Sequence, residues 1–110
     1  MTVLVCHCAC PDADSARRIA ERVVDERLAA CASVLPGMHS VYRWQGQVEH
    51  ADEVMLLIKT SRERLPALTG RVLALHPYEL PELVAVEAAG GSPAWLDWVV
   101  AETAQEPASE

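Results

Sequence analysis

An uninterrupted run of five apolar residues, from Val54 to Ile58, constrains the fold of this chain more than any other feature. A strand with one face in water alternates apolar and polar side chains, whereas this run contains no polar side chain. It therefore predicts a strand that is covered on both faces. A chain of 110 residues is enough for one domain and too short for two, so part of that cover is expected to come from another copy of the chain.

Strand patterns precede and follow this run. The sequence predicts strands at 2–9, 31–44, 47–59 and 80–88. A bend or bulge is expected at Pro36-Gly37, and a turn at Gln45-Gly46 joins the second and third strands into a long hairpin.

Helical spacing of apolar residues predicts helices at 15–28 and 65–75, with Ser61 as the cap of the second. Ser92-Pro93 predicts the start of a third, short helix through Val99. The resulting order of strand, helix, strand, strand, helix, strand and added helix predicts an α+β fold of the ferredoxin-like, split βαβ type. Residues 1–103 are expected to form this single domain, and residues 104–110 a disordered acidic tail.

The charge is distributed unevenly. The net charge is −7, and beyond Arg71 the chain has seven acidic residues and no Lys or Arg. Phosphate backbones are bound by clustered Lys and Arg, so nucleic acid is not an expected partner, whereas cations are. There is no apolar run of about 18 residues and no basic, apolar leader pattern, so we expect no membrane association and a cytosolic location.

Four cysteines offer soft metal ligands: Cys6, Cys8, Cys10 and Cys31. Reduced thiols are favoured over two disulfides, because no export signal is present and the apolar core is large enough without crosslinks. Cys6, Cys8 and Cys10 recur every second residue and so share one face of the first strand, with Cys10 nearest the loop edge. Two interpretations stay open: three small apolar residues under the first helix, or a thiolate site for a soft ion such as Cu(I).

Further residues allow both a structural and a functional interpretation. Cys31 is either a small buried residue or a metal ligand, and His76 either a protonated cap on the second helix or a metal ligand. Trp44, beside the hairpin turn, points to a partner surface, and Lys59 either reaches solvent or pairs with a carboxylate such as Glu79.

The remaining histidines and tryptophans are given structural roles. His7, His39 and His50 lack partners at ligand spacing and are interpreted as surface or strand residues, and Trp95 with Trp98 as a packing stripe. No phosphate loop, zinc-protease motif, serine elbow or paired CxxC is present, so no catalytic residue is assigned and the chain is not expected to be an enzyme.

Four segments together resemble the CutA family, named for divalent-cation tolerance. They are ERLAAC (26–31), VYRWQG (41–46), LIKT (57–60) and HPYELPE (76–82). The resemblance implies a ferredoxin-like protomer in a tight homotrimer, similar to PII signalling proteins, with clefts between subunits and a role in tolerance of copper and other divalent metals. No cofactor is implied as obligatory.

By motif match, the resemblance assigns six residues to the cleft: Cys31, Trp44, Lys59, His76, Tyr78 and Glu79. Two segments depart from the family pattern. Ala32-Ser33 stands where the family commonly has Val-Asn, and the thiol-rich 6–10 segment stands where threonines are usual. We therefore expect a metal-binding trimer without catalytic turnover; the alternative is a PII-like signalling or scaffold module that binds a small ligand in the same clefts.

Overall fold

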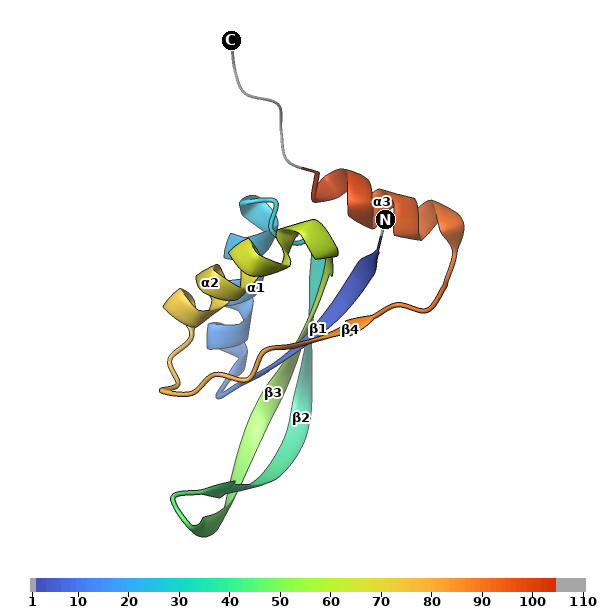
Figure 1. Cartoon of the computed structure of the whole chain (residues 1–110). Helices are drawn as coiled ribbons and strands as arrows, with labels where there is room; N and C mark the ends of the chain where they lie inside the picture. The colour runs from blue at the N-terminus through green and yellow to red at the C-terminus, as the bar shows by residue number, and fades with distance from the viewer. Residues whose placement is uncertain (1, 105–110) are drawn as a thin grey trace.

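The computed structural model describes residues 2–104 and has the predicted order of elements (Figure 1). The elements are β1 (Val3–Cys10), α1 (Ala13–Asp25), β2 (Cys31–Trp44), β3 (Gln47–Ser61), a 3₁₀ turn (Arg62–Arg64), α2 (Leu65–Leu75), β4 (Val84–Glu87) and α3 (Pro93–Glu102). The strands form one antiparallel sheet in the order β2-β3-β1-β4, which confirms the α+β, ferredoxin-like prediction. Most of the predicted acidic tail, residues 105–110, lies outside the described residues.

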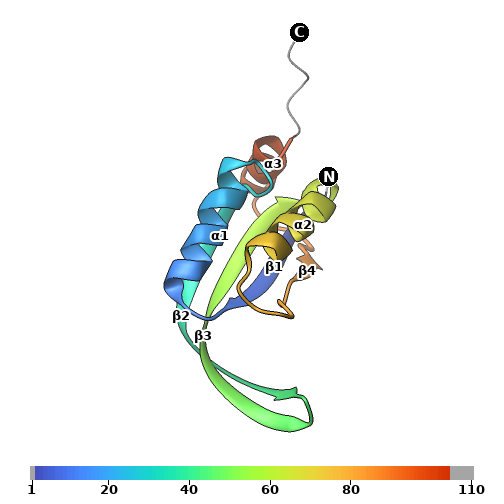
Figure 2. The ribbon, with the colours of Figure 1, turned by 90° about the vertical axis from the view of Figure 1, so that its left-hand side faces the viewer.

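Helices α1 and α2 lie side by side on one face of the sheet (Figures 1 and 2). Their apolar stripes, which include Ile19, Val23, Leu68 and Val72, are fully buried against the sheet. This packing sets which sheet residues form the core, because alternate residues of each strand point toward the helices.

The boundaries of α1 differ from the predicted 15–28. The helix begins at Ala13 because Asp12 caps it: the Asp12 Oδ1 accepts a hydrogen bond from the Ser15 N–H at 2.7 Å. It ends at Asp25, and Arg27 then adopts a left-handed φ of 59°, which turns the chain away from the helix axis.

Two other local predictions were wrong. The fourth strand is not 80–88 but Val84–Glu87, the part that pairs with β1; Pro81, which has no N–H, precedes it. Ser61 does not cap α2, whose N-cap residue is Arg64, whereas α3 begins as predicted, with Ser92 as its N-cap residue and Pro93 in its first turn. Ser61 instead ends β3 and accepts a hydrogen bond from the Thr103 hydroxyl at 3.0 Å.

The β2–β3 hairpin extends well beyond the helices (Figure 2) and accounts for the elongated dimensions of 52 × 32 × 23 Å. The register shifts between Leu35 and Met38, which confirms the bulge expected at Pro36-Gly37, where Gly37 has a φ of 85°. At the tip, Gln45 and Gly46 both have positive φ and form the predicted turn.

The sheet face opposite the helices is apolar and largely uncovered in one chain. At the β1–β4 edge, Val84 and Val86 are each 52% exposed. Helix α3 covers only one end of this face, where Val99 packs on Val3. The predicted packing stripe on α3 is only partly correct, since Trp95 and Trp98 contact each other but are each 41% exposed.

Candidate functional site

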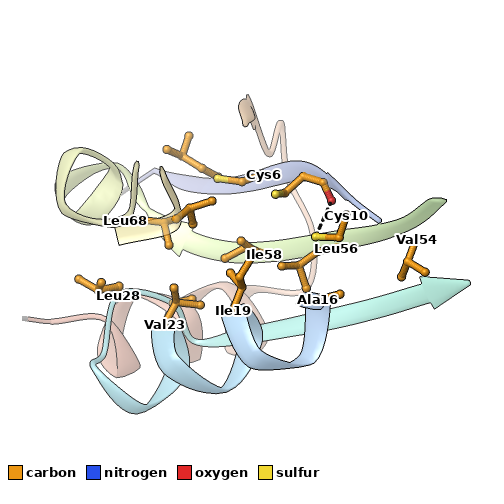
Figure 3. Close-up of a cluster of buried hydrophobic side chains, with 14 residues drawn as sticks. Cys6, Cys10, Ala16, Ile19, Val23, Leu28, Val54, Leu56, Ile58 and Leu68 are labelled. Atoms are coloured by element: carbon orange, nitrogen blue, oxygen red, sulfur yellow. Dashed lines mark hydrogen bonds between the residues drawn. The ribbon is translucent and has the colours of Figure 1, made fainter. Parts of the chain in front are cut away.

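The three thiols of β1 point into the core between the sheet and the two helices. All three are fully buried and belong to the main apolar cluster. Figure 3 shows this cluster, with Cys6 and Cys10 labelled. The predicted shared face is confirmed. Cys10, expected nearest the loop edge, is as inaccessible as the other two.

His76 lies where α2 ends, and its ring is held from both sides. The Tyr78 backbone N–H donates to His76 Nδ1 at 3.1 Å, so the ring proton is on Nε2, which donates to the Ala9 carbonyl at 2.8 Å. The ring is therefore neutral. The alternative of a protonated cap is wrong, since the C-terminal bond to Val72 O is made by the His76 backbone N–H.

Three of the predicted metal ligands converge. One ligand atom each from Cys8, Cys10 and His76 lie within 4.8 Å of one another, and all three residues are buried. We call this set the thiol–imidazole cluster. Two sulfurs and one imidazole nitrogen suit soft or borderline ions such as Cu(I) and Zn²⁺. To bind an ion, His76 would exchange one of its two ring hydrogen bonds for a metal bond.

The two thiols of the cluster are not equivalent in acidity. The hydrogen bond to Cys10, together with burial, raises the pKa of the Cys8 thiol, and the same hydrogen bond lowers the pKa of Cys10. The Cys8–Cys10 pair therefore loses its first proton, from Cys10, more readily than its second, from Cys8. For Cys6, burial alone raises the pKa to about 11.

Cys31 lies on the other face of the sheet. Both Cys31 and Val5 pair with Lys59, whereas Cys6 pairs with the adjacent Ile58, so Cys31 and Cys6 point to opposite sides. Within one chain, the predicted ligand Cys31 therefore lies apart from His76 and from the β1 thiols. Cys6 lies on the same face of β1 as Cys8 and Cys10 but is not among the three converging residues in the described chain.

A second site is a hollow of about 570 Å³ between the distal part of β2 in the hairpin and the segment that follows α2. It contains three of the predicted cleft residues, Trp44, Tyr78 and Glu79, and is lined in addition by Ala9, Ser40, Val41, Tyr42, Arg43, Glu53, Leu80 and Glu82. We call it the hairpin pocket. With three carboxylates against one guanidinium, its lining favours cationic over anionic ligands.

Lys59 does not line the hairpin pocket. Its Nζ donates to Ser33 Oγ at 2.8 Å, and of the two alternatives left open for Lys59, the ion pair with Glu79 is not formed among the described residues. Sequence reasoning also missed Glu53, which is almost fully buried and accepts a 2.6 Å hydrogen bond from the Tyr78 hydroxyl. Burial, and then this contact with Glu53, raise the pKa of Tyr78.

The hairpin brings together His39 and His50, which are 11 residues apart in the sequence. His39 contacts both His50 and Asp52 across the two strands. The turn at Gln45-Gly46 could have revealed this contact, because a two-residue loop that pairs Trp44 with Gln47 also places His39 opposite Asp52.

The fold and the thiol–imidazole cluster define a small ferredoxin-like protein in whose core two thiols and an imidazole converge. No helix among residues 2–104 is long and apolar enough to span a membrane. Residues 4–102 match the family model of the CutA1 divalent ion tolerance protein, and the chain belongs to that family.

Individual relatives agree with this assignment. The divalent-cation tolerance protein CutA of Thermus thermophilus is 49% identical over 89 residues, which are 81% of this chain and 86% of that protein. Mouse protein CutA is 43% identical over 82% of this chain, which spans about half the length of the mouse protein. A solved structure of the Thermus thermophilus protein superposes with a TM-score of 0.90 at 45% identity, covering 93% of this chain and 99% of that one.

Proposed function

We propose that this protein is a cytosolic homotrimer that binds copper, or another thiophilic metal ion, at the thiol–imidazole cluster and acts in metal tolerance without catalytic turnover. The observation that carries the proposal is the convergence of Cys8, Cys10 and His76 within 4.8 Å. Membership of a family named for divalent ion tolerance supports the same role.

The donor set favours Cu(I) over harder ions. Thiolates select soft metals and two of the three converging ligand atoms are sulfurs, whereas Mg²⁺ and Ca²⁺ require a set of oxygen ligands. His76 is already neutral, so it needs no deprotonation to bind through Nδ1.

Competition for Cu(I) with a chromogenic chelator under reducing conditions tests this proposal. Wild type is compared with the double variant Cys8→Ala, Cys10→Ala, and Cys6→Ala is the matched control because it removes a buried thiol from the same face of the same strand. We expect the double variant to lose at least tenfold in affinity and the control to retain it. Equal affinity of the folded double variant and wild type would reject the cluster.

Two features of the uncovered sheet face support the trimer. The first is the exposed apolar surface at Val84 and Val86. The second is His7, whose side chain shares that face with Leu57 and Val84 and whose buried Nδ1 has no hydrogen-bond partner within residues 2–104. A buried polar atom without a partner costs free energy that an adjoining subunit could recover. We expect an obligate interface above roughly 2,000 Å² in total.

A second candidate function is favoured by the hairpin pocket. Its volume of about 570 Å³ and its three aromatic side chains, Tyr42, Trp44 and Tyr78, suit a small organic ligand, as in the PII-like alternative. Isothermal titration with small cations, nucleotides and small acids, beside copper and zinc, separates the two functions. Ligand heats that survive in the Cys8→Ala, Cys10→Ala variant and vanish in Trp44→Ala would favour the second function.

A further inference from the structure

Two exposed histidines face each other across the hairpin, away from the thiol–imidazole cluster. His39 Nε2 lies 3.0 Å from His50 Nδ1, with ring centroids 5.2 Å apart, and His39 Nδ1 lies 2.9 Å from Asp52 Oδ1. His39 is on β2, while His50 and Asp52 are two residues apart on β3 and so share one face.

The contact with Asp52 decides how the His39 ring is protonated. A carboxylate can only accept, so His39 Nδ1 carries the proton that the bond to Asp52 requires. In neutral His39 the lone pair is then on Nε2, aimed at His50 Nδ1. A carboxylate that holds one ring nitrogen in this way fixes the tautomer and orientation of metal-binding histidines.

From this geometry we propose that His39 Nε2 and His50 Nδ1 form a second metal site, for a borderline divalent ion such as Zn²⁺, Ni²⁺ or Cu²⁺, with Asp52 orienting His39. Bonds of about 2.0–2.1 Å at angles between 90° and 109° place two ligand nitrogens roughly 2.9–3.4 Å apart. The observed 3.0 Å falls in that range, so the spacing of the two nitrogens suits an ion that replaces the proton between the rings.

This site differs from the thiol–imidazole cluster in donors and in access. It offers two imidazole nitrogens on an exposed surface, where water completes the coordination, instead of buried sulfurs. Imidazole suits Zn²⁺, Ni²⁺ and Cu²⁺, whereas thiolates select Cu(I). The inference goes beyond the proposed function and does not rest on it.

The test is isothermal titration of tag-free protein with Ni²⁺ and Zn²⁺ in the Cys8→Ala, Cys10→Ala background, which removes the thiol cluster. In that background we expect one ion per chain, at least tenfold weaker binding for His39→Gln or His50→Gln, and a smaller loss for Asp52→Asn. Glu49→Gln is the matched control, because it removes an exposed side chain of the same strand outside the histidine pair. The Glu49→Gln variant should bind Ni²⁺ and Zn²⁺ with the same affinity as the Cys8→Ala, Cys10→Ala background.

A second measurement identifies the ligands directly. Paramagnetic Ni²⁺ should broaden the ring signals of His39 and His50 before those of His7 and His76. Absence of binding in the background, or equal affinity after both histidines are replaced, would overturn the inference. Cu(I) competition should be unchanged in the His39→Gln, His50→Gln variant, so failure of this site is distinguishable from failure of the thiol cluster.

Discussion

Tyr78 donates a 2.6 Å hydrogen bond to the nearly buried carboxylate of Glu53, which fastens the segment after α2 to β3 at the base of the hairpin. The same segment carries His76, whose ring packs against Tyr78 at a centroid distance of 4.8 Å. Tyr78 lines the hairpin pocket and His76 belongs to the thiol–imidazole cluster, so the contact between these two rings joins the two sites.

Removing the Tyr78 hydroxyl should destabilise the protein. Tyr78→Phe leaves the Glu53 carboxylate without its partner, and we expect a loss of about 2 kcal/mol in the free energy of unfolding. Urea unfolding at neutral pH measures it. Tyr42→Phe, which removes a hydroxyl from the same pocket, is the control and should cost much less. Equal losses in the two variants would show that the hydrogen bond to Glu53 contributes nothing.

Stability should fall at alkaline pH, in part because of Cys6. Burial raises the Cys6 pKa from the ordinary 9.0 to about 11, so between these values the folded protein retains a proton that the unfolded chain has lost. The contribution is complete below pH 9 and declines as pH rises, by up to about 1.4 kcal/mol per pH unit. Unfolding free energies measured from pH 8 to 10.5 should show a shallower decline for Cys6→Ala. An unchanged slope would contradict the assignment.

A charge on the uncovered sheet face should prevent assembly while leaving the fold intact. In light scattering at micromolar concentration, we expect wild type near three times the 12.0 kDa chain mass and Val86→Glu at one chain mass. Leu73→Glu is the control, since Leu73 is an exposed apolar residue on α2, on the helical side of the molecule. A wild-type monomer, or a Val86→Glu trimer, would reject this face as the interface.

The thiols should differ in reactivity. Cys6, Cys8 and Cys10 are buried and Cys31 is partly exposed, so a thiol reagent should modify at most one cysteine per chain before unfolding and four afterwards. Mass spectrometry of the native reaction should locate any adduct at Cys31, and Cys31→Ser should abolish it. Rapid labelling of Cys8 or Cys10 in the native protein would show that the cluster opens to solvent.

Local patterns were sufficient to predict much of the fold. The period-two spacing of Cys6, Cys8 and Cys10 placed them on one face, and Gln45-Gly46 defined the turn of the hairpin, because both signals depend only on neighbouring residues. The exact ends of α1 were missed: the structure shows that Asp12 caps the helix, which therefore begins at Ala13, and that the left-handed backbone of Arg27 ends it before Leu28.

Local patterns could not predict which residues meet at the candidate site. The sequence by itself determined the kinds of ligand available and the face of β1 that carries three of them. Only the tertiary structure decided that His76, which follows α2, meets Cys8 and Cys10, and that Cys31 faces the other way. The physical reason is that β2 adjoins β3 and β3 adjoins β1, so the face on which each side chain lies follows from register between strands that are distant in sequence.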